Sequence, residues 1–178
     1  RTALNPIRPV GMQIADVLRR HAGLPRATAR GRAVELLRRV QIPDAERRAA
    51  AYPFELSGGM CQRVMIALAI ACAPDLLIAD EPTTGLDVTT QAAILDLLGE
   101  LADERRMATI LITHDLGLAA ERCARIVVMH AGHVVETAPT AMLFASPRHP
   151  YTARLIASTP RPRAKLGEVL PIPGAVPD

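Results

Sequence analysis

The stretch that decides the fold is Asp75-Leu76-Leu77-Ile78-Ala79-Asp80-Glu81-Pro82-Thr83, an apolar run that ends in two adjacent acids. A short apolar run bounded by a proline and by charges favours a buried strand of a parallel sheet. A second such run, Ala108–Ile112, follows a segment at Val88–Arg105 whose apolar residues recur at helical spacing. Together they predict a strand–helix–strand unit, and therefore an α/β fold.

Helices and one hairpin are predicted on either side of this unit. Before it, apolar spacing predicts helices at Val10–His21, from a Thr28 cap to about Val40, and briefly after Pro43 and Asp44. After it, the pattern predicts a helix at Leu116–Arg122, a hairpin turning at Ala131-Gly132, a helix at about Tyr151–Ser158 and a Pro-rich tail from Pro160 to Asp178.

The composition allows a sizeable core and narrows the classes of function. Of the 178 residues, 49% are hydrophobic and 22% charged, which excludes wholesale disorder. The net charge is only +3 and aromatic residues make up 2%, so no nucleic-acid partner is expected. The three cysteines form no CxxC pair, and they encode neither a disulfide framework nor a thiolate metal site.

The two acids stand at the carboxyl end of a strand, where open α/β sheets bind their ligands. Asp80 is placed to hold Mg²⁺, because hard cations prefer oxygen ligands. Glu81 is placed to polarise a water for attack on a phosphoryl group. The alternative is that both acids only cap the next turn. His114 follows the second strand and could contact the same phosphate, although a single histidine there is more often structural.

A glycine pair precedes an apolar helix at Leu56-Ser57-Gly58-Gly59-Met60. Ser57 can cap that helix, and the two glycines let a ligand approach bare backbone amides. A helix start of this kind binds anions, although an ordinary turn before a core helix is the alternative. Further along, Thr84-Gly85-Leu86-Asp87 leads into the next helix, and Asp87 could simply be its N-cap.

In this order, the four motifs resemble those of ABC-transporter ATPase subunits over roughly residues 1–137. Ser57–Arg63 is similar to the signature motif of that family, and Asp75–Glu81 to its Walker B strand. Gly85–Asp87 is similar to the D-loop, and His114 to the switch histidine. Thr2–Pro6 and His149–Leu155 resemble stretches of the oligopeptide/dipeptide importer branch, in which Met60 is also usual.

The resemblance implies a P-loop-NTPase-like, three-layer α/β core of mainly parallel strands with a helical subdomain, incomplete because its N-terminal part is missing. The sequence holds no G-x-x-x-x-G-K-[ST] phosphate loop, so we expect the C-terminal part of a longer protein. The expected divisions are a helical subdomain at 1–55, the C-terminal part of the ATPase core at 56–137, and a C-terminal extension with the Pro-rich tail at 138–178. No cysteine follows Cys123, so no iron–sulfur site is predicted.

In this family, two ATPase domains close head to tail around two ATP molecules. The resemblance implies that Asp80 holds Mg²⁺ and that Glu81 and His114 are catalytic in this chain's own site. It also implies that the nucleotide-binding residues are Ser57, Gly58, Gly59, Gln62 and Asp87. Of these, Ser57, Gly58 and Gly59 would bind the γ-phosphate of the partner's ATP, and Asp87 would lie at the dimer seam.

The implied function is the ATP-hydrolysing motor of an importer for peptides or similar small solutes, peripheral at the cytoplasmic face of the membrane. Its implied partners are a second ABC ATPase subunit, transmembrane permease subunits and, indirectly, an extracytoplasmic solute-binding protein. The complete chain is expected to hydrolyse ATP, and the 178-residue piece alone to be inactive. The alternatives are a non-catalytic, truncated interaction module and an ABC-type ATPase without a role in transport.

Overall fold

A computed structural model describes residues 4–159, which fall into two units divided between Ile112 and Thr113. The predicted Pro-rich tail lies outside the described residues. The predicted domain divisions after residues 55 and 137 stay predictions.

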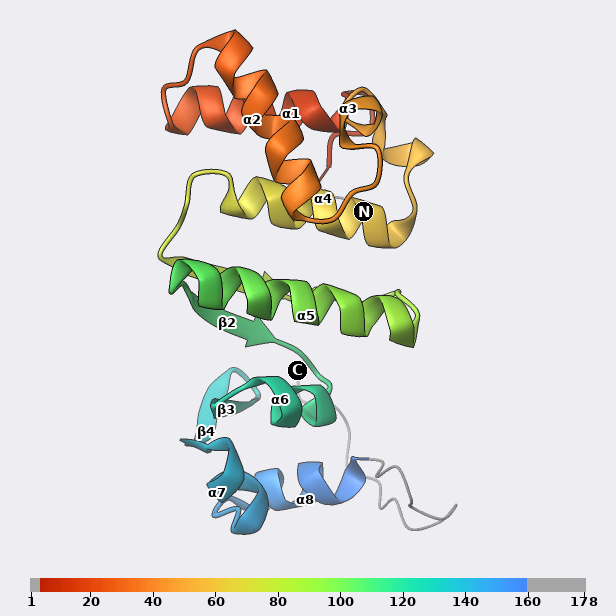
Figure 1. The fold of residues 1–178 in the computed structure, drawn as a ribbon. Coiled ribbons are helices and arrows are strands. Elements are labelled where there is room, and N and C mark those ends of the chain that lie inside the picture. The colour runs from red at the N-terminus through yellow and green to blue at the C-terminus, as the bar shows by residue number, and fades with distance from the viewer. Residues whose placement is uncertain (1–3, 160–178) are drawn as a thin grey trace. The chain divides into compact units, whose positions relative to one another are not determined.

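The first unit begins with a helical region whose helices form their own core (Figure 1). Its elements are α1 (Val10–His21), α2 (Arg26–Arg39), α3 (Ala45–Arg48), a 3₁₀ turn η1 (Pro53–Glu55) and α4 (Gly58–Ile70). The largest side chains at its centre are at most 2% exposed, and they are Ile14, Leu18, Leu36, Leu37 and Ile70. The helix predicted at Val10–His21 is confirmed at both ends.

The predicted start of α2 is wrong. Thr28 does not cap the helix, because α2 begins at Arg26 and its N-cap is Pro25, three residues earlier. The carbonyl of Pro25 accepts the Ala29 amide at 2.9 Å, which is the first bond of the helix. Pro25 has an extended ψ of 150°, and the backbone turns helical only after it, so the proline and not the threonine sets this boundary.

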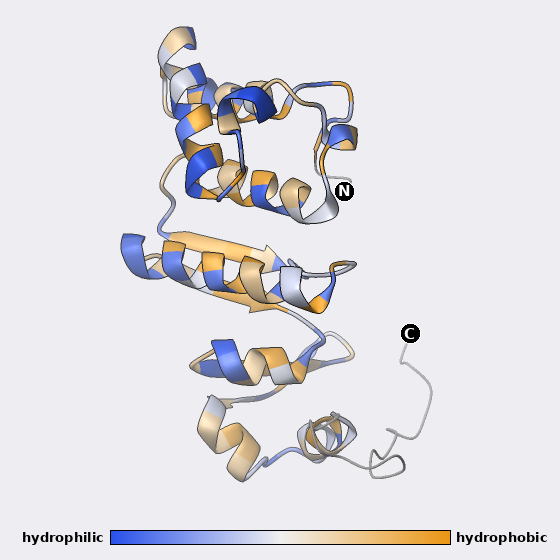
Figure 2. Cartoon of the chain, turned by 45° about the vertical axis from the view of Figure 1, so that its right-hand side comes forward, coloured by the Kyte–Doolittle hydropathy of each residue, from blue (hydrophilic) through white to orange (hydrophobic). Residues whose placement is uncertain are grey.

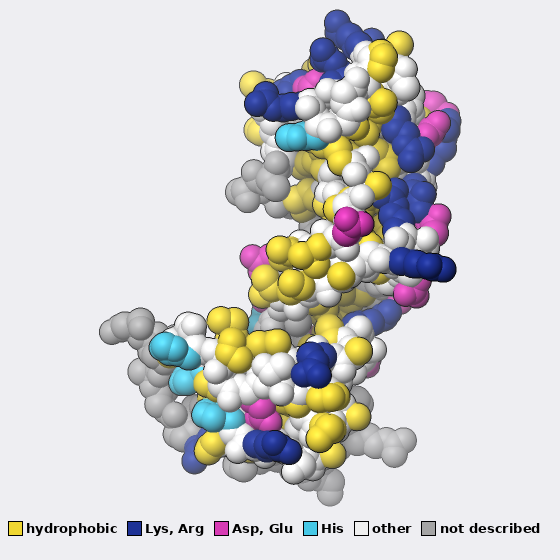
Figure 3. All heavy atoms as spheres, turned by 90° about the vertical axis from the view of Figure 1, so that its left-hand side faces the viewer, with side chains coloured by type: hydrophobic (Ala, Val, Ile, Leu, Met, Phe, Trp, Pro, Cys, Tyr) yellow, Lys and Arg dark blue, Asp and Glu magenta, His cyan; other side chains and the backbone are white. Residues whose placement is uncertain are grey.

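Arginine side chains are numerous on the outer surface of the helical region (dark blue in Figure 3). Several lie in ion pairs, namely Arg32 with Glu35, Arg38 with Glu46 and Arg39 with Glu104. Exposed pairs of this kind contribute roughly 0–1 kcal/mol each, so the core, and not these pairs, holds the helices together.

The second half of this unit is the predicted strand–helix–strand unit. Strands β1 (Leu76–Asp80) and β2 (Ala108–Ile112) are parallel, with Leu76 opposite Ala108 and Asp80 opposite Ile112. Helix α5 (Val88–Arg105) connects them and lies beside the strands in both views (Figures 1 and 2).

The expectation of a fully buried strand is wrong for β1. Leu77 and Ala79 are buried, but the alternate residues Leu76 and Ile78 are 47% and 60% exposed. In β2, Ile110 and Ile112 are also about half exposed, at 49% and 47%. The reason is that a strand's side chains alternate between two faces, and here one face of the sheet stays open. Both strands are hydrophobic along most of their length (orange in Figure 2).

The second unit is a hairpin with short helices. It contains α6 (Leu116–Arg122), β3 (Arg125–His130), β4 (His133–Pro139), α7 (Thr140–Ala145) and α8 (Pro150–Ser158). The predicted helix at Leu116–Arg122 and the predicted antiparallel hairpin are both confirmed. Its small core consists of Leu116, Ala119, Ile126, Val128 and Leu143.

One carboxylate fastens α8 to this hairpin. The carboxylate of Glu136 on β4 accepts the Arg148 amide at 2.9 Å and the His149 amide at 3.0 Å. His149 in turn caps α8, because its Nδ1 accepts the Tyr151 amide. The Tyr151 ring also stacks on His130, with ring centroids 4.2 Å apart. The predicted helix near the end of the chain is therefore tied to the hairpin at its first turn.

Candidate functional site

The glycine pair opens α4 as predicted, and Ser57 is its N-cap. The Ser57 hydroxyl accepts the Met60 amide at 3.2 Å, and the Ser57 carbonyl accepts the Cys61 amide at 2.9 Å. Gly58 and Gly59 are the first two residues of the helix, where the helix itself offers no acceptor for their amides. These amides and the positive end of the helix dipole suit a phosphate oxygen. Gln62 lies one turn further along and is half-buried.

Asp87 caps α5 in the same way, and both of its oxygens are bound by one residue. Oδ1 accepts the Thr90 amide at 2.9 Å, and Oδ2 accepts the Thr90 hydroxyl at 2.6 Å. These bonds, the hydroxyl's first, hold the pKa of the Asp87 carboxyl below its usual value. The N-cap alternative is therefore correct as a description of local structure. It leaves Asp87 exposed, so it does not conflict with a role at an interface.

The two acids lie together at the carboxyl end of β1. Asp80 is the last residue of the strand and is exposed. The amide of Glu81 donates to the Ile112 carbonyl at 2.9 Å, so the end of β2 borders the same place. Oε2 of Glu81 accepts a hydrogen bond from the Thr84 hydroxyl at 2.8 Å, which agrees with the alternative that the acids cap the next turn. Within residues 4–159 there is no cluster of three or more His, Cys, Asp or Glu side chains suited to a metal ion.

Glu81 also adopts an unusual backbone conformation. Its φ is +46°, in the left-handed region that a residue with a Cβ rarely enters. Such a conformation costs on the order of 1–3 kcal/mol and is concentrated at functional sites. It therefore singles out Glu81 from the neighbouring carboxylates. The Asp80 donor set fits Mg²⁺, because this ion is commonly held by one or two carboxylates together with waters and substrate phosphates.

His114 belongs to the second unit, where it is exposed in the bend between β2 and α6. The next residue, Asp115, caps α6 by accepting the Leu118 amide at 3.0 Å. The predicted meeting of His114 with Asp80 and Glu81 would join the two units, and it stays a prediction.

Three of the four predicted motifs lie at one edge of the first unit. Helices α4 and α5 run side by side in the same direction, so both begin at this edge (Figure 1). Strand β1 ends there as well, because only residues 81–87 separate it from α5. Two helix starts and two exposed or half-buried carboxylates thus share an edge, which could meet phosphate oxygens and a divalent cation.

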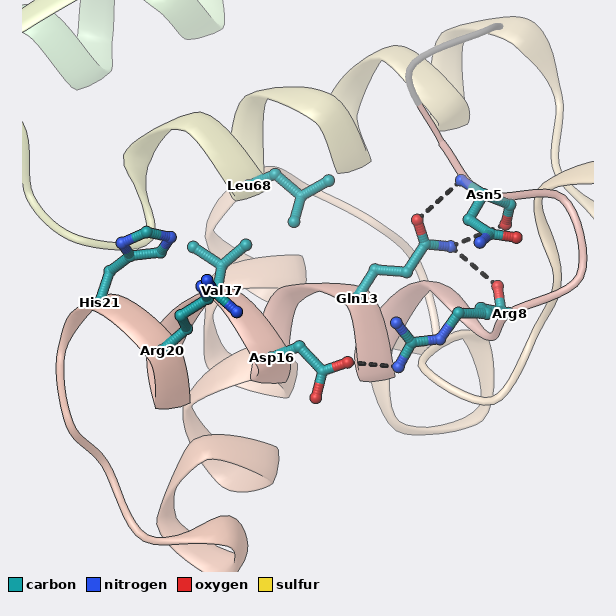
Figure 4. A pocket seen from close by; sticks show the side chains of 8 residues that line it. All are labelled: Asn5, Arg8, Gln13, Asp16, Val17, Arg20, His21 and Leu68. Carbon is teal, nitrogen blue, oxygen red and sulfur yellow. Dashed lines mark hydrogen bonds and ion pairs between the residues drawn. The ribbon is translucent and has the colours of Figure 1, made fainter.

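Sequence reasoning missed an open pocket of about 330 Å³ on the helical region (Figure 4). The amide side chain of Gln13 crosses it, accepting the Asn5 amide at 2.9 Å and donating to the carbonyls of Asn5 and Arg8. Arg8 pairs with Asp16 on its rim. The pocket combines the N-terminal stretch, α1 and Leu68 of α4, so no local pattern in the sequence indicated it.

Comparisons with known proteins agree with this geometry. The family model described as "ABC transporter" matches residues 6–84, and the model for the C-terminal region of oligopeptide/dipeptide transporters matches residues 135–178. The dimeric ATP-binding cassette MJ0796, solved with ADP and Pi, shares 31% identity at a TM-score of 0.66, over 77% of this chain and 59% of that one.

Among curated proteins, the chain is similar to ATP-binding proteins of peptide transporters. The dipeptide transport ATP-binding protein DppD of Escherichia coli is 52% identical over 176 residues, which cover 99% of this chain and 54% of the relative. The probable peptide ABC transporter ATP-binding protein y4tR of Sinorhizobium fredii is 53% identical over 177 residues, covering 99% and 53%. The chain thus spans about half the length of the curated relatives it matches.

The fold and the family match show that the chain is similar to part of an ABC-transporter cassette. More narrowly, over nearly its whole length the chain is similar to a C-terminal portion of the ATP-binding proteins of peptide and dipeptide importers. Within residues 4–159, no helix combines the length and the apolar character that a membrane span requires.

Proposed function

We propose that this chain is part of the ATP-hydrolysing motor of an importer for peptides or similar small solutes. The observation that carries the proposal is the shared edge of the first unit, where the starts of α4 and α5 meet the end of β1. The likeness to peptide-importer ATP-binding proteins over nearly the whole chain supports it.

In this proposal, the start of α4 serves a partner's nucleotide. The amides of Gly58 and Gly59, with the Ser57 hydroxyl beside them, bind the γ-phosphate of an ATP held by a second ABC ATPase subunit. Gln62 on the same helix adds a polar side chain near that phosphate. Asp87, fixed and exposed at the start of α5, lies at the seam between the two subunits.

The end of β1 serves this chain's own nucleotide. Asp80 would hold Mg²⁺, directly or through water, and the ion would neutralise charge on the transferring phosphoryl group. Glu81 orients the attacking water and accepts its proton, while Thr84 keeps one of its carboxylate oxygens in place. His114 contacts the γ-phosphate or the attacking water.

The helical region from α1 to α3 is the surface that we assign to the permease subunits, at the cytoplasmic face of the membrane. It offers the pocket of Figure 4, whose rim carries both signs of charge from Arg8, Asp16 and Arg20. A loop of a membrane subunit with mixed polar groups would fit such a rim. The solute-binding protein would act on this chain only through those subunits.

The test is ATP turnover by the complete polypeptide that contains these residues, assembled with its partner subunits. Replacing Glu81→Gln should lower kcat by about 10²–10⁴-fold, since a general base contributes roughly that factor. Glu55→Gln is the matched control, because Glu55 only caps the 3₁₀ turn η1. Undiminished turnover with Glu81→Gln would remove Glu81 from its role.

The 178-residue chain alone should bind ATP negligibly, because it contains no phosphate loop. Isothermal titration calorimetry with Mg²⁺ and ATP measures this directly. A submillimolar Kd for the isolated chain would contradict the assignment of its glycine motif to a partner's nucleotide.

A further inference from the structure

We propose that Thr90 is a positioning residue that couples Gly59, in the signature-like motif, to Asp87, in the D-loop-like turn. Through this coupling the two loops that face a partner subunit hold one fixed relation to each other. The inference rests on the proposed function, because it gives Thr90 a part in assembling the nucleotide site.

The first half of the coupling is the pair of hydrogen bonds to Asp87. The Thr90 amide and hydroxyl each bind a different oxygen of the Asp87 carboxylate, at 2.9 and 2.6 Å. An amide bond alone would cap α5 with any residue at position 90. The hydroxyl bond is specific to Ser or Thr, and it fixes the rotation of the carboxylate as well as its position.

The second half is the contact with Gly59. A Cβ built on Gly59 would lie 2.7 Å from Cγ2 of Thr90, closer than two carbon atoms can approach. The space that a side chain would need at position 59 is thus taken by the Thr90 methyl group. A side chain at position 59 would therefore force the Thr90 side chain to shift, in addition to affecting any contact with nucleotide.

The two halves are joined because the methyl and the hydroxyl of a threonine sit on the same Cβ. Rotation about χ1 moves them together, in steps between staggered positions. A push on the methyl from Gly59 would turn the hydroxyl away from Asp87. Movement of the glycine motif is thus transmitted to the D-loop-like carboxylate through a single side chain.

The surrounding helices resist the alternative, which is that α4 and α5 simply move apart. At their far ends, the Arg105 guanidinium on α5 donates to the Ile70 carbonyl on α4 at 2.8 Å. Along its length α5 also buries a row of large apolar side chains, namely Ile94, Leu95, Leu97, Leu98 and Leu101. With the far ends joined in this way, a clash at Gly59 acts mainly on Thr90.

The experiment is a rescue series in the complete polypeptide assembled with its partner subunits, with kcat and KM for ATP measured separately. Gly59→Ala should lower kcat/KM at least tenfold. Thr90→Ser keeps the hydroxyl that binds Asp87 and removes the methyl that meets Gly59, so alone it should lower kcat/KM less than Gly59→Ala does. The double variant should lose less kcat/KM than Gly59→Ala alone, because the methyl group that an alanine side chain at position 59 would strike is gone. A double variant as impaired as Gly59→Ala would overturn the proposal.

A second readout does not depend on turnover. In ¹³C-carboxyl NMR, Thr90→Val should raise the pKa of Asp87 toward its usual value, since the first cause of its lowering is the Thr90 hydroxyl. Gly59→Ala should raise the same pKa, and adding Thr90→Ser should lower it again. An Asp87 pKa unmoved by Gly59→Ala would overturn the coupling.

The two readouts separate this inference from the proposed function. If the parent protein showed no ATP turnover that depends on Glu81, the proposed motor function would be rejected. The NMR series would still decide whether Gly59 is linked to Asp87. Circular dichroism on each variant identifies any that fails to fold, and Thr90→Ser, the mildest change, keeps the series interpretable.

Discussion

The helical region and the parallel sheet of the first unit both contain large apolar side chains, yet they differ in how completely they bury them. Leu37, in α2, is 0% exposed, whereas Ile78, in β1, is 60% exposed. The helices need only one apolar stripe each and can cover one another. A parallel strand has two apolar faces, and one helix covers only one of them. The helical region therefore completes its own core, while the sheet requires further cover.

The hairpin of the second unit is an intermediate case. Its inner face packs on short helices, with Ile126 and Val128 buried, while Val127, Met129 and Val134 are more than half exposed. Part of its cover is α8, which Glu136 fastens. The fastening carboxylate makes this cover sensitive to pH, unlike the purely apolar core of the helical region.

The largest expected difference in the free energy of unfolding is between alanine substitutions at one buried and one half-exposed leucine. Leu37→Ala should cost about 2–5 kcal/mol in the free energy of unfolding, because it leaves a cavity in a closed core. Leu76→Ala, at a side chain that is 47% exposed, should cost less than about half as much. Urea unfolding of both variants measures the difference, and equal losses would break the comparison.

A smaller loss is expected at the start of α4. Ser57→Ala removes the acceptor for the Met60 amide and should cost about 1 kcal/mol. Ser57→Asp, which keeps an N-cap oxygen, is the control and should lose little. If both variants unfolded at the same urea concentration as the parent, the cap would contribute nothing to the helical region.

A pH effect is expected at the hairpin. The Arg148 amide, and after it other donors, holds the pKa of the Glu136 carboxyl below its usual 4.5. Its contribution to stability is therefore full above pH 4.5 and disappears as the pH falls through the lowered value. Thermal unfolding between pH 6 and pH 3 should show this loss, and Glu136→Gln should flatten it. An unchanged slope in that variant would exclude Glu136 as the cause.

The smallest effect on stability is expected at the open sheet face. Ile78→Thr should change the free energy of unfolding by no more than about 0.5 kcal/mol, because its side chain is already mostly in water. It should nevertheless reduce self-association of the chain, since it interrupts an apolar patch. Sedimentation velocity tests this, with Ile7→Thr, at an isolated exposed site, as the control.

Most helices and strands were predictable because single residues or short turns mark their ends. Asp87 and the strand beyond Arg105 mark both ends of α5, and Ala131-Gly132 marks the hairpin turn, so these elements appear where the sequence places them. The start of α2 was predicted wrongly because Thr28 is of a residue type that often caps helices. Pro25, whose ring fixes its own φ, is the N-cap instead and starts the helix earlier.

The candidate site was predictable only as far as its chemistry is local. The caps at Ser57 and Asp87 follow from residue type and spacing. The contact between Gly59 and Thr90 depends on how closely two helices approach, which residues 31 positions apart do not reveal. The left-handed backbone of Glu81 is likewise a consequence of the turn after β1, and glutamate as a residue type gives no sign of it.

The most direct measurement is a structure of the complete Glu81→Gln polypeptide, with its partner subunits, Mg²⁺ and ATP. We expect Asp80, residue 81 and His114 around the γ-phosphate of one bound ATP, with Ser57, Gly58 and Gly59 against the γ-phosphate of the other. Nucleotide bound without these residues, or His114 turned away from the acids that end β1, would contradict it.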